Sequence, residues 1–259
     1  MGGCALRKGR TVTMPSPMAD ALHTPLPEET PEKKTFPYAT WGAWEALGAT
    51  VLALIAGILL SFPILILNGG VDTDDLGAGT KVAIQVCTGI GFLLIPIGLA
   101  FISGGGSRRE VFGRLGFRSF AIGNAVKWIA IGVASYFAFA AVYSAIFGSP
   151  EQDDIAGNFG PLAVQIIMIV IVAPITEEVC FRGMLFGGIR NRLPLWAAAL
   201  AAGAFFGLLH FTTGPSAVVP LIALGAIFAV VYEKTGSLWA SIIMHAFNNG
   251  LALLFIHLT

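Results

Sequence analysis

The sequence has few charged residues for its length. Lys, Arg, Asp and Glu make up 12% of the 259 residues, whereas residues of the set AVILMFWYC make up 56%, and the mean hydropathy is +0.80. A soluble domain carries roughly 25% charged residues, because its surface faces water. This composition excludes a soluble globular protein. It predicts an all-α, polytopic integral membrane protein.

Two further scarcities exclude other classes of protein. The 15 basic residues balance 15 acidic ones, so the formal net charge is zero and no nucleic-acid partner is expected. The chain has only three cysteines, Cys4, Cys87 and Cys180, without the spacing of a metal site. A disulfide framework is therefore not expected either.

The first 40 residues lack an apolar helical face. They carry several prolines, and no apolar run follows the early basic residues Arg7, Lys8 and Arg10, so a secretory signal peptide is not predicted. We interpret 1–40 as a disordered cytosolic tail and 41–259 as a transmembrane helical domain.

Apolar runs near the roughly 20 residues that a membrane-spanning helix needs recur from Trp41 onward. They predict a bundle of seven transmembrane helices, or eight if the third or fourth run is split. The predicted spans are 44–67, 82–103, 120–147, 161–190, 194–210, 216–232 and 236–256.

Basic residues concentrate in the tail and the even-numbered loops, which predicts that these segments and the N-terminus are cytosolic. In a bacterium the membrane would be the plasma membrane. Segment 107–119 fits either a short interfacial helix on anionic lipid or an ordinary basic loop. Residues at the predicted cytosolic ends fit an aromatic belt: Trp41, Trp44, Trp196, Tyr232 and Trp239. Two of the odd-numbered loops are acidic, with Asp72, Asp74 and Asp75 in the first and Glu151, Asp153 and Asp154 in the third.

Apart from Glu45 and Arg190 at span ends, only four charged residues fall within the predicted spans: Lys127, Glu177, Glu178 and Arg182. A charge in hydrocarbon costs at least about 2.5–3.5 kcal/mol, so it needs a partner or a function. Lys127 lies near a span end and can extend its amine to the interface. Glu178 and Arg182 are four residues apart on one helix and are predicted to pair. Glu177 is left without an intrahelical cation, which suits a general base.

Two polar clusters lie in other spans. Phe206 and His210 share one face of the fifth span, and His245 and Asn249 share one face of the seventh. A lone membrane histidine is more often a packing residue, but two histidines, a spare carboxylate and an amide favour catalysis. Glu177 and His210 could activate a water molecule, while His245 and Asn249 could donate hydrogen bonds to an oxyanion.

Spans four and five form a predicted hairpin that would bring Glu177 and His210 together. Their heights above the turn are roughly 20 and 24 Å at about 1.5 Å per residue. Small residues four apart predict close packing of these two helices: Gly183 and Gly187 in one, Gly203 and Gly207 in the other. Pro174, just before Glu177, predicts a kink.

These residues resemble the motifs of a known family. Glu177-Glu178-Val-Cys-Phe-Arg182, Phe206 to His210 and His245 to Asn249 are similar to the EExxxR, FxxxH and HxxxN motifs of the CAAX-protease and bacteriocin-processing (CPBP) intramembrane endopeptidases, which include the type II CAAX prenyl proteases. The resemblance covers about 160–256.

The resemblance implies hydrolysis of a peptide or protein substrate in contact with membrane lipids, with lipid-modified proteins among the family's substrates. It assigns Glu177 and His210 to water activation and His245 and Asn249 to the oxyanion site. Glu178, Arg182 and Phe206 would support them.

Three alternatives stay open at this point. Glu177, His210 and His245 could instead be three ligands of a catalytic zinc ion. We favour a metal-free, cofactor-free reaction, because Asn249 is a poor zinc ligand and no HExxH motif is present. The protein could also be a non-catalytic binding or bacteriocin-immunity protein that uses the same cavity. A proton-coupled transporter is less favoured, because no inverted repeat is evident.

Overall fold

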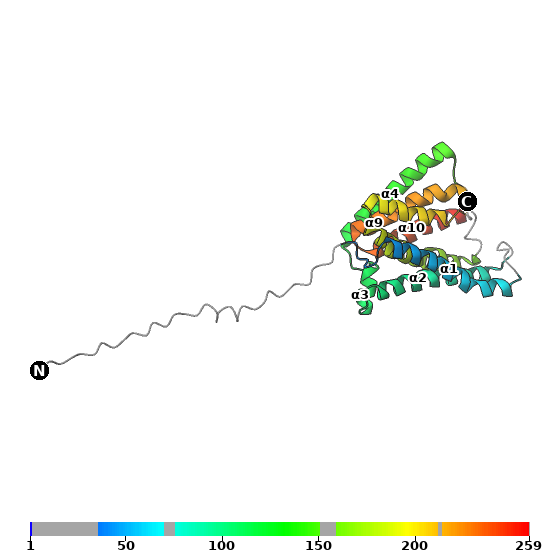
Figure 1. Ribbon diagram of the computed structural model, residues 1–259. Helices are drawn as coiled ribbons and strands as arrows, with labels where there is room; N and C mark the ends of the chain where they lie inside the picture. The colour runs from blue at the N-terminus through cyan, green and yellow to red at the C-terminus, as the bar shows by residue number, and fades with distance from the viewer. Residues whose placement is uncertain (2–35, 70–75, 151–158, 212–213, 259) are drawn as a thin grey trace. The chain divides into compact units, whose positions relative to one another are not determined.

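The computed structural model describes residue 1 and residues 36–69, 76–150, 159–211 and 214–258. Within these ranges the chain is helical and contains no strand, which confirms the all-α membrane bundle (Figure 1). Most of the predicted tail and both acidic loops lie outside the described residues. The elements are α1 (Ala43–Leu67), α2 (Ala78–Ile102), α3 (Arg108–Arg114), α4 (Ile122–Phe147), α5 (Leu162–Gln165), η3 (Ile166–Val172), α6 (Ala173–Glu178), η4 (Val179–Phe186), α7 (Gly187–Arg190), α8 (Leu195–Leu208), η5 (Pro215–Ala217), α9 (Val218–Thr235) and α10 (Leu238–Leu258).

Six helical segments are long and apolar enough to cross a membrane among the described residues, one fewer than the sequence predicted. They are α1, α2, α4, the continuous run Leu162–Arg190, the run Pro215–Thr235 and α10. The predicted fifth span is the exception. There α8 has 14 residues, about 21 Å at 1.5 Å per residue, which is short of a hydrocarbon core of about 30 Å.

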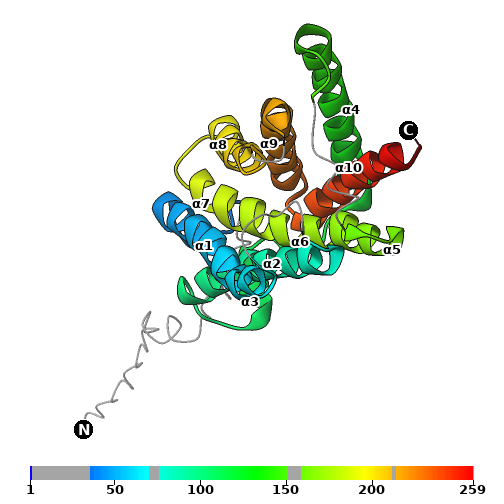
Figure 2. The same ribbon diagram turned by 90° about the vertical axis from the view of Figure 1, so that its right-hand side faces the viewer.

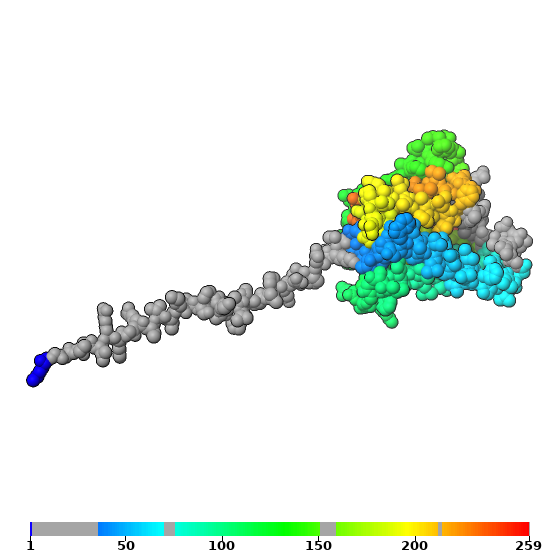
Figure 3. All heavy atoms as spheres, in the orientation of Figure 1, coloured from blue at the N-terminus to red at the C-terminus, as the bar shows by residue number. Residues whose placement is uncertain are grey.

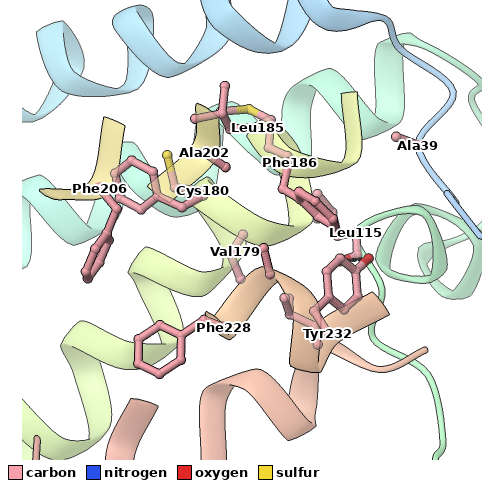
Figure 4. Packing of buried hydrophobic residues seen from close by; sticks show 14 of the residues in the cluster. Ala39, Leu115, Val179, Cys180, Leu185, Phe186, Ala202, Phe206, Phe228 and Tyr232 are labelled. Carbon is pink, nitrogen blue, oxygen red and sulfur yellow. Dashed lines mark hydrogen bonds between the residues drawn. The ribbon is translucent and has the colours of Figure 1, made fainter. Parts of the chain in front are cut away.

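The central element is η4, all eight residues of which are buried. It contacts α1, α2, α8, α9 and α10, and these helices surround it when the bundle is viewed along its length (Figure 2). Phe181 packs edge-on against Phe92 of α2 and Phe206 of α8, with ring centroids 5.5 and 5.6 Å apart. Figure 4 shows part of this core, which fixes the helix that carries the EExxxR residues.

Run Leu162–Arg190 is not a uniform α-helix. Its segments η3 and η4 are π-helical, and the short α6 between them carries Glu177 and Glu178. Pro174, at which the sequence predicts a kink, occupies the first turn of α6, and π-helical segments lie on both sides of α6. Turns of the π type are rare and are frequently found at functional sites.

The small-residue face of α8 packs against α9 and not, as predicted, against the fourth span. A side chain added at Gly203 or Gly207 would meet the backbone of Ile222, and Gly225 of α9 lies against Gly203. Gly183, in contrast, lies against the carbonyl of Leu115. Small residues on both α8 and α9 let these two backbones approach closely.

Helix α3 forms within the segment predicted as either an interfacial helix or a loop. Both the backbone N–H and the hydroxyl of Ser107 donate to Glu110, and the backbone bond is the main cause that lowers the pKa of Glu110. Arg114 donates to the carbonyls of Ala100 and Gly105. This arginine therefore binds the end of α2.

Two of the five residues assigned to the aromatic belt are buried inside the protein. Trp41 is 3% exposed and its indole N–H donates to the carbonyl of Met184 at 2.9 Å, while Tyr232 is 1% exposed. Trp44, Trp196 and Trp239 are exposed. Residues 36–40, the described end of the predicted tail, also pack on the bundle; for example, the Phe36 ring lies 5.1 Å from that of Tyr232.

Helix α4 is the least embedded span. Only 6% of its apolar window is buried, and its C-terminal part projects from the bundle in the ribbon and space-filling views (Figures 1 and 3). Its inner face nevertheless contributes Tyr136 and Phe137 to the cavity described next.

Candidate active site

A cavity of about 570 Å³ opens among the membrane-spanning helices. Its wall is mainly apolar, with residues from α2, α4, η3, α6, α8, α9 and α10. All four residues predicted to be catalytic line it, together with the aromatic residue of the second motif: Glu177, His210, His245, Asn249 and Phe206. The structure therefore brings the three motifs, separated by up to 72 residues from Glu177 to Asn249, to one space.

The predicted pair of Glu178 and Arg182 is present behind this cavity. Arg182 Nη1 lies 2.8 Å from Glu178 Oε1, and both side chains are fully buried. Arg182 also donates from Nη2 to the carbonyl of Gly225 at 3.0 Å. Its guanidinium carbon lies 4.6 Å from the centre of the Phe206 ring and 5.0 Å from that of Phe228. The cation is thus enclosed by an anion, a carbonyl and aromatic faces.

His245 lies between the two glutamates. Its Nδ1 is 3.0 Å from Glu178 Oε1, and its Nε2 is 3.7 Å from Glu177 Oε2. Because a carboxylate only accepts, Nδ1 carries a proton and donates it to Glu178, which turns Nε2 toward Glu177. The ring stacks on Phe228 at 4.6 Å between centroids. Glu178 therefore orients the histidine, and Glu177 remains at the cavity surface, 16% exposed.

His210 follows the end of α8. Its Nδ1 lies 2.8 Å from the carbonyl oxygen of Phe206. A carbonyl accepts, so Nδ1 carries the proton and the neutral ring has its lone pair on Nε2. The Phe206 ring lies 5.0 Å from the His210 ring and 5.7 Å from the His245 ring. Phe206 thus packs against both histidine rings.

Asn249 is held by a backbone carbonyl. Its Nδ2 donates to Ile169 of η3 at 3.0 Å. An amide nitrogen has two N–H groups, and this bond uses one of them. The carbonyl of a π-helical segment therefore orients the side chain predicted to bind the oxyanion.

Ser241 is a site residue that sequence reasoning missed. Its hydroxyl donates to Glu178 Oε2, so the buried carboxylate has three partners: Arg182, His245 and Ser241. The spacing held a signal, because Ser241 lies four residues before His245 and shares its helix face. Glu178 is consequently the centre of a network that links η4 to α10.

Replacing Ser241 with Ala is expected to lower the free energy of unfolding by about 2 kcal/mol, because hydrogen bonds to charged groups contribute about 1.5–3 kcal/mol. Unfolding in detergent, followed by circular dichroism, measures the change. Ser61→Ala is the matched control, since the buried Ser61 hydroxyl donates only to Gly57 of its own helix. Equal stability of the two variants would contradict a structural role for Ser241.

The residues of the zinc alternative are not gathered into a metal-binding group. No set of three or more His, Cys, Asp or Glu side chains in the described part of the chain is arranged to hold a metal ion. Both ring nitrogens of His245 face carboxylates. Glu177, His210 and His245 line one cavity, but the structure does not arrange them as a ligand set.

Comparisons with known proteins agree with the three motifs. Residues 159–251 match the family model described as type II CAAX prenyl endopeptidase Rce1-like. The chain is 33% identical over 89 residues to the putative membrane peptidase YdiL of Bacillus subtilis (strain 168), which covers 34% of this chain and 36% of that protein. It is 31% identical over 109 residues to the UPF0177 protein YxdF of Lactococcus lactis subsp. lactis (strain IL1403). That alignment covers 42% of this chain and 58% of YxdF.

These matches are partial. The chain aligns with between about a third and three fifths of the length of these two relatives, and no solved structure matches. The matched segment contains Glu177, His210, His245 and Asn249. The resemblance to the CAAX-protease family, of the Rce1-like type II prenyl endopeptidases, is thus confirmed over residues 159–251.

Proposed function

We propose that this protein is an intramembrane endopeptidase that hydrolyses a peptide bond of a membrane-associated substrate near the cytosolic side. One observation carries the proposal: a single cavity among membrane-spanning helices is lined by Glu177, His210, His245 and Asn249. The match to a family of endopeptidases and the name of the Bacillus relative support it.

In the proposed reaction, Glu177 and His210 hold a water molecule. Glu177 takes a proton from it as its oxygen attacks the carbonyl carbon of the substrate. His245 and Asn249 donate hydrogen bonds to the resulting oxyanion and stabilise it. When the C–N bond breaks, Glu177 gives the proton to the leaving nitrogen. The products are a carboxylic acid and an amine, and Glu177 is again a carboxylate.

The buried network gives this reaction its geometry. Glu178 is fully buried and fixes His245 through Nδ1, while Arg182 neutralises the carboxylate. Electrostatic stabilisation of an oxyanion is larger in a site that excludes water and needs no reorganisation. The apolar wall would accommodate a hydrophobic or lipid-modified substrate.

The proposal is tested with the purified protein in lipid vesicles and a library of quenched fluorescent peptides, with and without a farnesylated C-terminus. We expect the unsubstituted protein to cleave a subset of the peptides and the His245→Ala variant to cleave none. Peptides that bind without being cleaved would contradict the peptidase and favour a binding or immunity protein. Accessibility of the N-terminus to an added protease, compared between right-side-out and inside-out membrane vesicles, tests whether the N-terminus is cytosolic.

Chelation distinguishes the metal-free reaction from the zinc reaction. Because the favoured base is Glu177, we expect the cleavage rate to be unchanged after treatment with 1,10-phenanthroline and dialysis. Loss of cleavage that added zinc restores would contradict the metal-free mechanism and assign Glu177, His210 and His245 as ligands. Thermal unfolding of the treated protein controls for damage to the bundle.

A further inference from the structure

Three polar side chains line the cavity and have no part in the proposed reaction. They are Gln85 of α2, Tyr136 of α4 and Asn248 of α10. None of the three has a hydrogen-bond partner among the residues that the structure describes. Polar groups within a membrane protein cost free energy when they are unpaired, so such groups in a mainly apolar wall indicate a ligand with complementary polar atoms.

Gln85 lies close to the level of the reacting groups. Gly89, one turn away on α2, packs against the side chain of Thr176, the residue directly before Glu177. Four residues correspond to about 6 Å along the helix. The Gln85 amide is therefore about one helical turn from the layer that contains Glu177, toward the N-terminal end of α2.

Tyr136 and Asn248 are displaced by a similar amount. Gly132 of α4 packs against Met244, the residue before His245, and Tyr136 follows Gly132 by four residues. Asn248 follows His245 by three residues on α10. These separations are about 6 and 4.5 Å, both toward the C-terminal ends of their helices.

The three displacements have the same direction. The N-terminal end of α2 and the C-terminal ends of α4 and α10 lie at one end of the bundle (Figure 1). Gln85, Tyr136 and Asn248 therefore form a polar layer beside the catalytic layer, with contributions from three helices that face one cavity.

We propose that Gln85, Tyr136 and Asn248 form a subsite that hydrogen-bonds the main chain of an extended peptide substrate, one or two residues from the bond that is cleaved. This inference rests on the proposed peptidase function. A side-chain amide offers one acceptor and two donors, which complement a peptide group. An extended chain rises about 3.3 Å per residue, so a layer 4.5–6 Å away meets it one or two residues along.

An unwound peptide in a membrane needs such partners. When the chain becomes extended for attack, its N–H and C=O groups lose their hydrogen bonds to water or within a helix. Apolar walls cannot provide replacement partners for these groups. The polar layer lowers the free-energy cost of these lost hydrogen bonds, and it does so without contacting the side chains of the substrate. It predicts a preference for an extended main chain over a particular sequence.

Binding to the catalytically inactive protein tests the subsite. The full chain with Glu177→Gln is placed in detergent micelles with a fluorescein-labelled decapeptide of alternating Leu and Ala, and Kd is measured by fluorescence anisotropy. Adding Gln85→Leu or Asn248→Leu is expected to weaken binding about fivefold or more, the change for one lost hydrogen bond. Tyr136→Phe is expected to act in the same direction.

An ester scan identifies the partner as main chain. Replacing one peptide amide at a time with an ester removes an N–H group. We expect an ester at one or two positions to weaken binding. In a protein that already carries Gln85→Leu or Asn248→Leu, the same ester should cause no additional loss, because the two changes remove the same contact. Uniform effects at all positions would overturn the proposal.

Tyr143→Phe is the matched control on α4. Its hydroxyl donates to the carbonyl of Ser216, and the residue does not line the cavity, so Kd is expected to be unchanged. Unchanged or tighter binding in all three cavity variants would overturn the subsite and indicate an apolar occupant such as a lipid chain. Binding that depends on Gln85 in a protein that cleaves no peptide would count only against the proposed reaction.

Discussion

Replacing Glu177 with Gln is expected to lower kcat by about 10³-fold while KM stays nearly unchanged. Gln has the same shape but cannot accept a proton, and general bases contribute about 10²–10⁴-fold. Loss of an interaction made only in the transition state lowers kcat and kcat/KM equally. Initial rates of peptide cleavage in vesicles, taken over a range of peptide concentrations, separate the two constants.

The position of Glu177 makes this substitution informative. Its carboxylate lines the cavity at 16% exposure and lies 3.7 Å from His245 Nε2, whereas the adjacent Glu178 is fully buried in an ion pair. Glu177→Gln should therefore unfold at the same temperature as the natural sequence. The control Glu233→Gln removes a carboxylate that pairs with Arg190 outside the cavity, and should retain the full rate. Retained cleavage in Glu177→Gln would exclude this residue as the base.

The contacts that follow helical periodicity could be predicted from the sequence. Glu178 and Arg182 pair as their four-residue spacing requires, and the same spacing places His245 and Asn249 on one wall of the cavity. The scarcity of charge also indicated which residues to follow, because a charge in a membrane span needs a partner. These inferences need only one helix at a time.

Contacts between helices were harder to predict. Gly203 and Gly207 indicated close packing, but a single sequence does not say which helix approaches, and the partner is α9. Trp41 fits an aromatic belt by position, yet its indole bonds to Met184 in the core. The π-helical turns around α6 have no signature in residue type. Ser241 was missed because small polar residues are common in membrane helices and its partner Glu178 is 63 residues away.

The ion pair behind the cavity leads to the second large effect. Arg182→Met is expected to lower the free energy of unfolding by about 3–5 kcal/mol, because removing one partner leaves a buried carboxylate uncompensated. Glu178 would keep only His245 and Ser241 as partners. Met preserves much of the volume between Phe206 and Phe228, so packing contributes less to the loss. Unfolding in detergent, followed by circular dichroism, measures the change.

The partly exposed pair of Arg190 and Glu233 provides the control, because its contact distances are similar to that of the buried pair. Arg190 makes two contacts of 2.8 and 3.0 Å with the carboxylate, but its side chain is 25% exposed and that of Glu233 15%. Arg190→Met should therefore cost about 1 kcal/mol or less, since water replaces the lost partner. The double variant Glu178→Gln with Arg182→Met should lose less free energy of unfolding than the sum of the losses in the two single variants. In the double variant both charges are absent, so no buried charge is left unpaired. Equal losses for Arg182→Met and Arg190→Met, or simple additivity in the double variant, would show that burial of the Glu178 charge does not determine the stability of the site.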